Sequence, residues 1–194
     1  MKLRRNFYTH RDACDAAIDL LGKVLVTNGP GGRTAGIITE TEAYTGVRDR
    51  ASHAFGGKRT ARNASMYARG GTAYVYLCYG IHKLFNVVVQ GIDVPEAVLI
   101  RAIHPVEGID TMVQRRPLAR SSTVGPGTLT QALGITLDDD GVDLTKDRIW
   151  IEDIGKTVDR ERIIRGPRIG VGYAGPDALL PYRFRIAPSP TDHQ

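Results

Sequence analysis

The sequence has little cysteine, and its two cysteines, Cys14 and Cys78, form neither a disulfide framework nor a cluster with histidine. Small secreted domains that depend on disulfides carry many cysteines, and structural zinc sites need Cys and His at close, regular spacing. We therefore expect two free, buried thiols, one in a helix and one in a strand. We also expect no bound metal and no cofactor.

Long apolar runs are absent as well. A membrane-spanning helix needs about 20 consecutive apolar residues, and no segment of this chain approaches that length. The first residues are charged and lead straight into Phe7-Tyr8-Thr9-His10, without the apolar stretch of a signal peptide. These absences predict a soluble, cytoplasmic protein with no membrane partner.

The composition is that of an ordinary globular domain, with 42% hydrophobic and 24% charged residues. A chain of 194 residues can bury a substantial core, and we expect one domain over residues 1–194. The net charge of +5 favours an anionic partner only weakly. The distribution of charge says more, because Arg59 and Arg62 stand in a loop-like segment where cations are available to phosphate groups.

Hydrophobic periodicity and turn residues predict an α+β fold built on a mainly antiparallel sheet. Residues 45–71 lack periodicity and are expected to form a functional loop with a short helix near 62–67. The first helix is expected to follow Thr9 as its N-cap, and residues 188–194 to form a loose tail. Helices are expected over 10–22, 107–116 and 128–133, and strands over 23–27, 34–44, 72–79, 83–90, 97–103, 148–152, 168–173 and 182–186.

An acidic and aromatic pattern ends the strand expected over 34–44. In Glu40-Thr41-Glu42-Ala43-Tyr44, alternation puts both carboxylates and the ring on one face of the strand. An edge strand with a solvated acidic face would explain the pattern without any function. For the isolated pattern this is the favoured interpretation; a site that uses a carboxylate as a base is the alternative. The local pattern does not distinguish Glu40 from Glu42.

Two polar residues interrupt apolar strands. Arg101 falls within Val98-Leu-Ile-Arg-Ala-Ile103, where an unpaired buried guanidinium would be costly. It needs a carboxylate or a bound water as a partner, either in a structural ion pair with any acid or, if the partner is Glu42, in a pair that holds a water molecule between the two side chains. Asn86 interrupts another apolar strand, which a satisfied core amide or a bulge would explain.

Tyrosines are concentrated around an expected hairpin. Strand propensity alone explains Tyr74. Tyr79 is different, because a ring at a Gly-containing hairpin tip projects into solvent unless something receives it. A protruding ring beside basic loops is what a nucleic-acid-binding protein can insert between base steps.

An ordered set of motifs extends from about Gly36 to Arg185: Glu40-Thr-Glu-Ala-Tyr44, His53, Arg62-Asn63, Gly71-Thr-Ala-Tyr-Val-Tyr-Leu-Cys-Tyr-Gly80, Asn86, Leu99-Ile-Arg-Ala102, Gly125-Pro126, Gln131-Ala-Leu-Gly-Ile135 and Arg168-Ile-Gly-Val-Gly-Tyr-Ala-Gly175. Together these motifs resemble the alkyladenine (3-methyladenine) DNA glycosylase family, in a bacterial-type member. The resemblance implies a curved sheet flanked by helices, with a protruding β-hairpin.

The resemblance also implies an activity. A monofunctional DNA glycosylase of base excision repair would flip an alkylated or deaminated purine out of duplex DNA and hydrolyse its N-glycosidic bond with water. The implied substrates are 3-methyladenine, 7-methylguanine, hypoxanthine and ethenoadenine. No lysine is among the matched catalytic positions, so Schiff-base chemistry is not expected. The implied partner is double-stranded DNA that contains damaged purines, bound by a monomer, at the nucleoid if the source is bacterial.

Roles carry over position by position. The resemblance implies that Glu42 activates the water, which Arg101 and the main-chain carbonyl near Val171 also hold. Tyr44 would stack on one face of the flipped base, with His53 and Tyr76 on the other.

The remaining matched positions would grip the DNA or select the base. Tyr79 would enter the minor groove and fill the gap left by the flipped nucleotide, and Asn86 would exclude guanine by clashing with its exocyclic amine. Arg59 and Arg62, in the basic loop, are expected to contact the DNA backbone.

Two other functions stay open from the sequence. A non-catalytic nucleic-acid-binding module would use the same basic loops and rings, but it gives no reason for Glu42 and Arg101 to converge. A small-molecule hydrolase would use Glu40 and Glu42 in one cleft, and it leaves Tyr79 unexplained.

Overall fold

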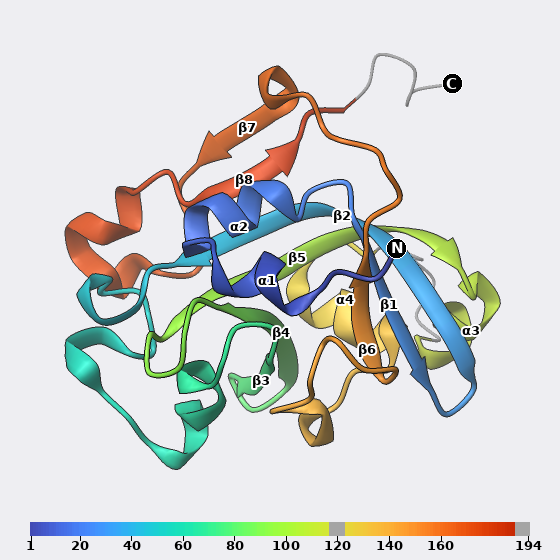
Figure 1. Ribbon diagram of the computed structural model, residues 1–194, viewed down its shortest axis with the longest axis horizontal. Helices are drawn as coiled ribbons and strands as arrows, with labels where there is room; N and C mark the ends of the chain where they lie inside the picture. The colour runs from blue at the N-terminus through green and yellow to red at the C-terminus, as the bar shows by residue number, and fades with distance from the viewer. Residues whose placement is uncertain (117–122, 189–194) are drawn as a thin grey trace.

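Eight strands form one curled antiparallel sheet in the computed structural model, which describes residues 1–116 and 123–188 (Figure 1). The main order is β3-β4-β5-β2-β1-β6, and β8 pairs with both β2 and β7. The expected tail over 188–194 lies outside the described residues from 189 onward. The strands are β1 (Val24–Gly29), β2 (Gly32–Tyr44), β3 (Ala73–Cys78), β4 (His82–Val89), β5 (Glu96–Glu107), β6 (Ile149–Glu152), β7 (Ile163–Gly166) and β8 (Arg183–Ile186).

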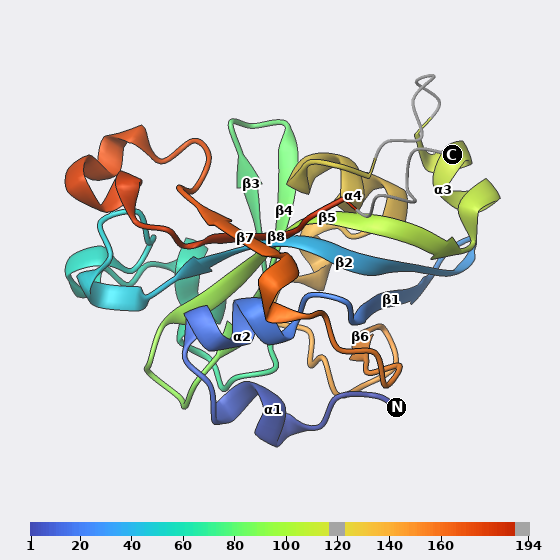
Figure 2. The ribbon, with the colours of Figure 1, turned by 90° about the horizontal axis from the view of Figure 1, so that it is seen from above.

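Helices cover both faces of this sheet, as Figure 2 shows. On one side are α1 (Arg5–Thr9) and α2 (Ala13–Asp19), and on the other are α3 (Ile109–Arg115) and α4 (Pro126–Leu133). None of the helices in the described ranges has the length and apolar character that a membrane span requires. The expected α+β fold, a single domain with a curved antiparallel sheet flanked by helices, is confirmed.

The packing of α2 and α4 explains why these segments are helical. Ala13, Ala16 and Ala17 place the apolar side of α2 in the main core. Pro126 at the first turn of α4 and Gly134 in the left-handed conformation after its last turn delimit that helix. Burial of each apolar stripe supplies most of the stability that such short helices lack alone.

The β3–β4 hairpin protrudes from the sheet (Figure 2). Its register runs from the Ala73–Val87 pair to the Cys78–His82 pair. Gly80, with φ 74°, allows the tight turn at the tip. The hairpin expected from two β-prone runs is therefore present.

Two expected elements are wrong. The helix expected over 10–22 with Thr9 as N-cap is preceded by a separate α1, and Asp12 caps α2 by accepting a hydrogen bond from the Asp15 N–H. The strand expected over 168–173 is not formed. Gly170, at φ 76°, breaks the extended run, and a 3₁₀ helix follows over Gly172–Leu179.

The two cysteines are unpaired, one in α2 and one in β3, as expected. Cys14 and Cys78 are nevertheless partly exposed, so the expectation that both are buried is wrong. Cys14 packs against the edge of the main core.

Candidate active site

The acidic end of β2 directs two carboxylates and a tyrosine to one face of the sheet. Thr41 and Ala43 point to the other face, where Thr41 Oγ1 donates a hydrogen bond to the Ala17 carbonyl of α2 at 2.9 Å. On the site face, the Tyr44 hydroxyl donates to Glu42 Oε2 at 2.9 Å. The alternation expected from the sequence is therefore present in the strand.

A β-bulge places Arg101 opposite these acids. Glu40 pairs with Ala102 of β5 and Thr41 pairs with Ile100, so Arg101 is an extra residue with no partner in β2. A bulge bends its strand and changes the direction of the side chain. Arg101, which interrupts the apolar run in the sequence, is thus the bulged residue of β5.

Arg101 joins the two carboxylates. Its Nε donates to Glu40 Oε1 at 2.7 Å, and its Nη1 lies 3.3 Å from Glu42 Oε1. Glu40 Oε1 also accepts from Arg183 Nε of β8 at 2.6 Å. Burial acts to raise the pKa of Glu40, but the hydrogen bonds from Arg183 and Arg101 outweigh it and hold that pKa below its usual range. Glu40 is therefore an ionised acid held by two guanidinium groups.

Glu42 is fully buried, and its carboxylate has three neighbouring donors. Oε1 accepts from the Ile169 main-chain N–H at 2.8 Å and faces Arg101 Nη1, while Oε2 accepts from the Tyr44 hydroxyl. Burial raises the pKa of Glu42, and the Arg101 charge with the two hydrogen bonds counteracts part of this rise. A carboxylate with increased proton affinity is suited to act as a base.

A cavity of about 840 Å³ opens beside this cluster. Tyr44, Arg101 and Ile169 line it, and Glu42 lies behind them in contact with all three. Further walls come from residues 50–63, the β3–β4 hairpin, the start of α4 and residues 169–173. Its volume is typical of pockets that hold small organic groups, about 300–1,000 Å³.

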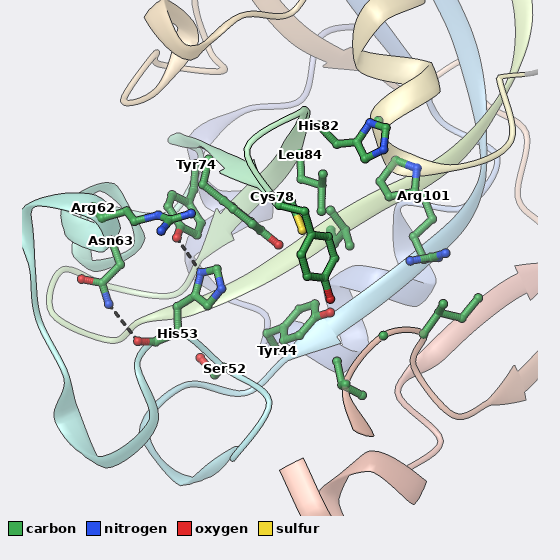
Figure 3. A pocket seen from close by; sticks show the side chains of 18 of the residues that line it. Tyr44, Ser52, His53, Arg62, Asn63, Tyr74, Cys78, His82, Leu84 and Arg101 are labelled. Carbon is green, nitrogen blue, oxygen red and sulfur yellow. Dashed lines mark hydrogen bonds between the residues drawn. The ribbon is translucent and has the colours of Figure 1, made fainter. Parts of the chain in front are cut away.

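The three residues expected to stack on a base, Tyr44, His53 and Tyr76, all line this cavity. The rings of His53 and Tyr76 meet edge to face, with centroids 4.6 Å apart. His53 is fixed on both sides, since its Nδ1 bonds the Tyr74 hydroxyl at 2.8 Å and its carbonyl accepts from Asn63 Nδ2 at 3.0 Å (Figure 3). Burial, together with two nearby basic side chains, lowers the pKa of His53, so its ring is neutral at neutral pH.

Tyr79 projects from the tip of the β3–β4 hairpin and is 84% exposed. Its φ of 50° is uncommon for a residue other than glycine and belongs to the tight turn at the hairpin tip. Ile81 beside it is also exposed. Tyr79 contributes to the cavity wall as well, so the apolar tip lies at the cavity mouth.

Of the two remaining predicted site residues, Val171 lines the cavity and Asn86 does not. Asn86 is buried, donates from Nδ2 to the Tyr74 carbonyl at 3.1 Å, and is not among the described residues that line the cavity. Val171 does line the cavity, and its main-chain carbonyl accepts from the Ala174 N–H at 2.9 Å. That carbonyl keeps a second lone pair for another donor.

The two basic loop residues are both engaged by the protein. Arg59 pairs with Asp93 at 2.7 Å and lies over the Tyr67 ring. Arg62 lines the cavity and donates to the Leu77 carbonyl of β3. Because Arg59 and its partner are largely exposed, this pair can exchange for other ionic partners at little cost.

The sequence did not predict a buried pair next to the site. Arg168 forms a two-pronged salt bridge with Asp49, at 2.5 and 2.8 Å, and neither side chain is exposed. Arg168 stands in a matched motif without an assigned role, and Asp49 lies in a loop without periodicity. Asp49 and Arg168 are far apart in the sequence, and a single sequence does not show that two distant residues lie together in the fold.

One lysine and one cysteine stand in the described cavity wall, Lys58 and Cys78. Lys58 is exposed, and its main-chain carbonyl accepts from Asn63 and Tyr67. Across residues 1–116 and 123–188, no three His, Cys, Asp or Glu side chains cluster as a metal ion would require. The expected absence of a metal stays a prediction.

Comparison with known proteins identifies the family. The family model described as methylpurine-DNA glycosylase matches residues 6–190. Three relatives carry the name "Putative 3-methyladenine DNA glycosylase". The relative from Chlamydia abortus is 47% identical over 95% of this chain and 97% of its own. The relative from Methanocella arvoryzae is 46% identical over 97% of this chain and 94% of its own. The relative from Bacillus cytotoxicus is 38% identical over 98% of each chain. The chain therefore belongs to the methylpurine-DNA glycosylase family, and the class that its motifs implied, a hydrolase of N-glycosyl bonds in DNA repair, is confirmed.

Proposed function

We propose that this protein flips a damaged purine out of duplex DNA into the aromatic cavity and releases the base by hydrolysis, with Glu42 as the general base. The observation that carries the proposal is the set of hydrogen-bond donors around the Glu42 carboxylate. Three of its about four lone-pair sites face Ile169, Arg101 and Tyr44. The remaining site on Oε2 would accept a water molecule admitted from the adjacent cavity.

The rings of the cavity suit a flat base. Tyr44 would stack on one face of the flipped base, and His53 with Tyr76 on the other, because all three line the same space. An alkylated purine carries positive charge, and aromatic faces attract cations. A neutral His53 adds no repulsion toward such a base.

Base release then needs few groups. The water oxygen bonds to C1′ of the sugar as the bond from C1′ to the base nitrogen breaks, and the bonding electron pair leaves with the base. Glu42 takes a proton from the water, and its negative charge stabilises the oxocarbenium-like transition state. Arg101 and the Val171 carbonyl would orient the same water. The products are the free base and an abasic site in an intact strand.

The substrate class extends the proposal. A charged base such as 3-methyladenine or 7-methylguanine leaves readily, whereas neutral hypoxanthine and ethenoadenine need a proton or a hydrogen bond as they depart. Weak pairing of a lesion lowers the cost of flipping by a few kcal/mol and favours damaged bases. Exclusion of guanine by Asn86 stays a prediction, which requires Asn86 to approach a bound base.

An assay on defined duplexes tests the function. Duplexes that contain hypoxanthine, ethenoadenine or a methylated purine are incubated with the protein, and strands are separated before and after alkali. We expect cleavage at the lesion only after alkali, since hydrolysis by water leaves an abasic site and no strand break. Cleavage without alkali would indicate lyase chemistry, and binding without any product would favour the non-catalytic binding module.

The rate of base release should depend on pH through the ionisation of Glu42. A general base must be ionised, so base release is expected to fall as the pH decreases through the pKa of Glu42. Burial raises that pKa above 4.5, the value of an ordinary glutamic acid, so the acidic limb should lie above pH 4.5. Single-turnover rates measured across this range on one lesion check the position. A rate that stays constant down to pH 4.5 would contradict the assignment.

Replacement of Tyr79 by serine should weaken the hold on flipped DNA. Loss of the exposed ring leaves the gap in the duplex unfilled, so we expect about tenfold weaker binding to lesion duplexes and slower flipping. Fluorescence of 2-aminopurine next to the lesion reports flipping directly. Phe55, another exposed ring in the cavity wall, is the control, and its replacement by serine should have the smaller effect. Unchanged flipping in the Tyr79→Ser variant would remove the wedge assignment.

A further inference from the structure

We propose that Arg168, held by Asp49, is a positioning residue that fixes the Tyr44 ring and, through it, the Glu42 carboxylate. The inference rests on the proposed function, because it assigns a role within the same site. Arg168 touches no space that a base would occupy, since its side chain is fully buried. Its effect on the reaction would therefore act through its neighbours.

The Arg168 guanidinium is held from several directions. Nη1 donates to Asp49 Oδ2 at 2.5 Å and to the Ala43 carbonyl at 2.8 Å. Nη2 donates to Asp49 Oδ1 at 2.8 Å and to the Asp177 carbonyl at 3.2 Å. These four bonds use every hydrogen of the two terminal nitrogens. The plane of the guanidinium is thereby fixed relative to β2.

This fixed plane lies against two rings. The central carbon of the Arg168 guanidinium is 4.8 Å from the centre of the Tyr44 ring and 5.3 Å from that of Tyr182. A cation over an aromatic face is attracted to it, and burial strengthens the attraction. Arg168 thus holds one face of the Tyr44 ring, while the Tyr44 hydroxyl donates to Glu42.

Two connections lead from Arg168 to the base of the reaction. The first is the Tyr44 ring and its hydroxyl bond to Glu42 Oε2 at 2.9 Å. The second is the main chain, because the next residue, Ile169, donates its N–H to Glu42 Oε1 at 2.8 Å. The Ile169 N–H belongs to the main chain and remains in an Arg168→Lys variant, so the Tyr44 ring is the connection that this substitution tests.

Lysine could not reproduce this arrangement. Its single nitrogen is a compact charge with three donors, and it lacks the planar fork that bonds Asp49 twice while it lies over the Tyr44 ring. Arg168→Lys therefore keeps the charge and removes the geometry. The alternative is that the Arg168–Asp49 pair only stabilises the fold. In that case, any loss of rate in Arg168→Lys would be the same with and without the Tyr44 ring.

A double-mutant cycle separates these possibilities. Single-turnover base release is measured for the wild-type protein, Arg168→Lys, Tyr44→Leu and the double variant, on the lesion that wild type releases fastest. We expect Arg168→Lys to slow release about tenfold in the wild-type background and to have little further effect when the ring is already absent. Arg11→Lys is the matched control, because Arg11 also pairs with an aspartate, at 2.7 Å, and lies over a ring, at 4.3 Å, away from the site.

The pH profile supplies a second readout that a structural role would not change. Burial raises the pKa of Glu42; the Arg101 charge, the Ile169 N–H and the bond from Tyr44 each lower it, and Glu40 raises it further. A loosened Tyr44 should therefore move the acidic limb of Arg168→Lys to higher pH. Thermal unfolding verifies that each variant folds, and if Arg168→Lys does not, Asp49→Asn passes through the same cycle.

Each outcome has one meaning. Loss of rate that requires Tyr44, with a shifted acidic limb, supports the positioning role. Equal loss in both backgrounds, or no loss, overturns it and leaves the glycosylase function intact. A wild-type protein that releases no base from any lesion overturns the proposed function, and the positioning role with it.

Discussion

Glu42→Gln should lower single-turnover base release by about 10³-fold, because a positioned general base contributes about 10²–10⁴-fold to such a reaction. The amide keeps the size of the side chain and one carbonyl oxygen, so the hydrogen bonds from Ile169 and Tyr44 can be retained in part. Binding of lesion duplexes should change by less than about threefold, since Glu42 does not line the cavity. Quenched release kinetics and fluorescence anisotropy measure the two quantities separately.

Glu96→Gln is the matched control for this variant. Glu96 is a partly buried acid of β5 that accepts a hydrogen bond from the Ala13 N–H at 2.8 Å, outside the cavity. The same chemical change there should leave the rate of base release within about twofold of the wild-type value. Near-normal release by Glu42→Gln would remove Glu42 from the mechanism. Loss of both release and binding would indicate a damaged fold instead.

Asp49→Ala should lower the free energy of unfolding by about 3–5 kcal/mol, the cost of leaving one member of a buried ion pair without its partner. Arg168 would then be a buried cation, with its Nε already lacking a partner among the described residues. Asp49 also accepts from the main-chain N–H groups of Thr45 and Ala51, which would lose their acceptor. Urea unfolding followed by the fluorescence of Trp150, the single tryptophan, measures the change.

Asp93→Ala provides the comparison. Asp93 pairs with Arg59 at 2.7 Å, but both side chains are more than half exposed. An exposed pair is worth about 0–1 kcal/mol, and alanine at the left-handed φ of 66° adds about 1 kcal/mol of strain, so Asp93→Ala should lower the free energy of unfolding by about 1–2 kcal/mol, less than Asp49→Ala. If Asp49→Ala and Asp93→Ala destabilise the protein equally, burial does not set the strength of the Arg168 pair.

The separate roles of the two acids follow from their partners. Glu40 accepts hydrogen bonds from Arg101 and Arg183, which lower its pKa. Glu42 has one guanidinium beside it and no exposure, and burial raises its pKa. A small-molecule hydrolase that used both acids as paired catalytic groups does not match this arrangement, because two guanidinium groups hold Glu40 ionised and only Glu42 has a raised pKa.

Local patterns in the sequence were enough for the elements that carry the site. Alternation in a strand is a property of the backbone, so it predicted that Glu42 and Tyr44 share a face. The β3–β4 hairpin with Tyr79 at its tip followed from two β-prone runs joined by Gly80. The α+β class followed in the same way, from the spacing of apolar residues and turns.

The errors have local causes as well. Asp12, three residues after Thr9, is the better placed cap for α2, so the helix begins later than its apolar pattern alone indicates. Gly170 takes a left-handed conformation that ends the apparent strand over 168–173. That irregular backbone directs the Ile169 N–H at Glu42, so the failed strand is part of the site.

Contacts between distant segments determine which of the two acids has the raised pKa. Arg168 and Asp49 are 119 residues apart, and Arg101 reaches Glu40 and Glu42 only because β5 contains a bulge. Periodicity along the chain encodes which side chains are buried, since burial follows from the geometry of one element. The proton affinity of Glu42 depends on which charges and donors the fold brings around it, and those come from three separate segments of the chain: β2, β5 and the loop at Ile169.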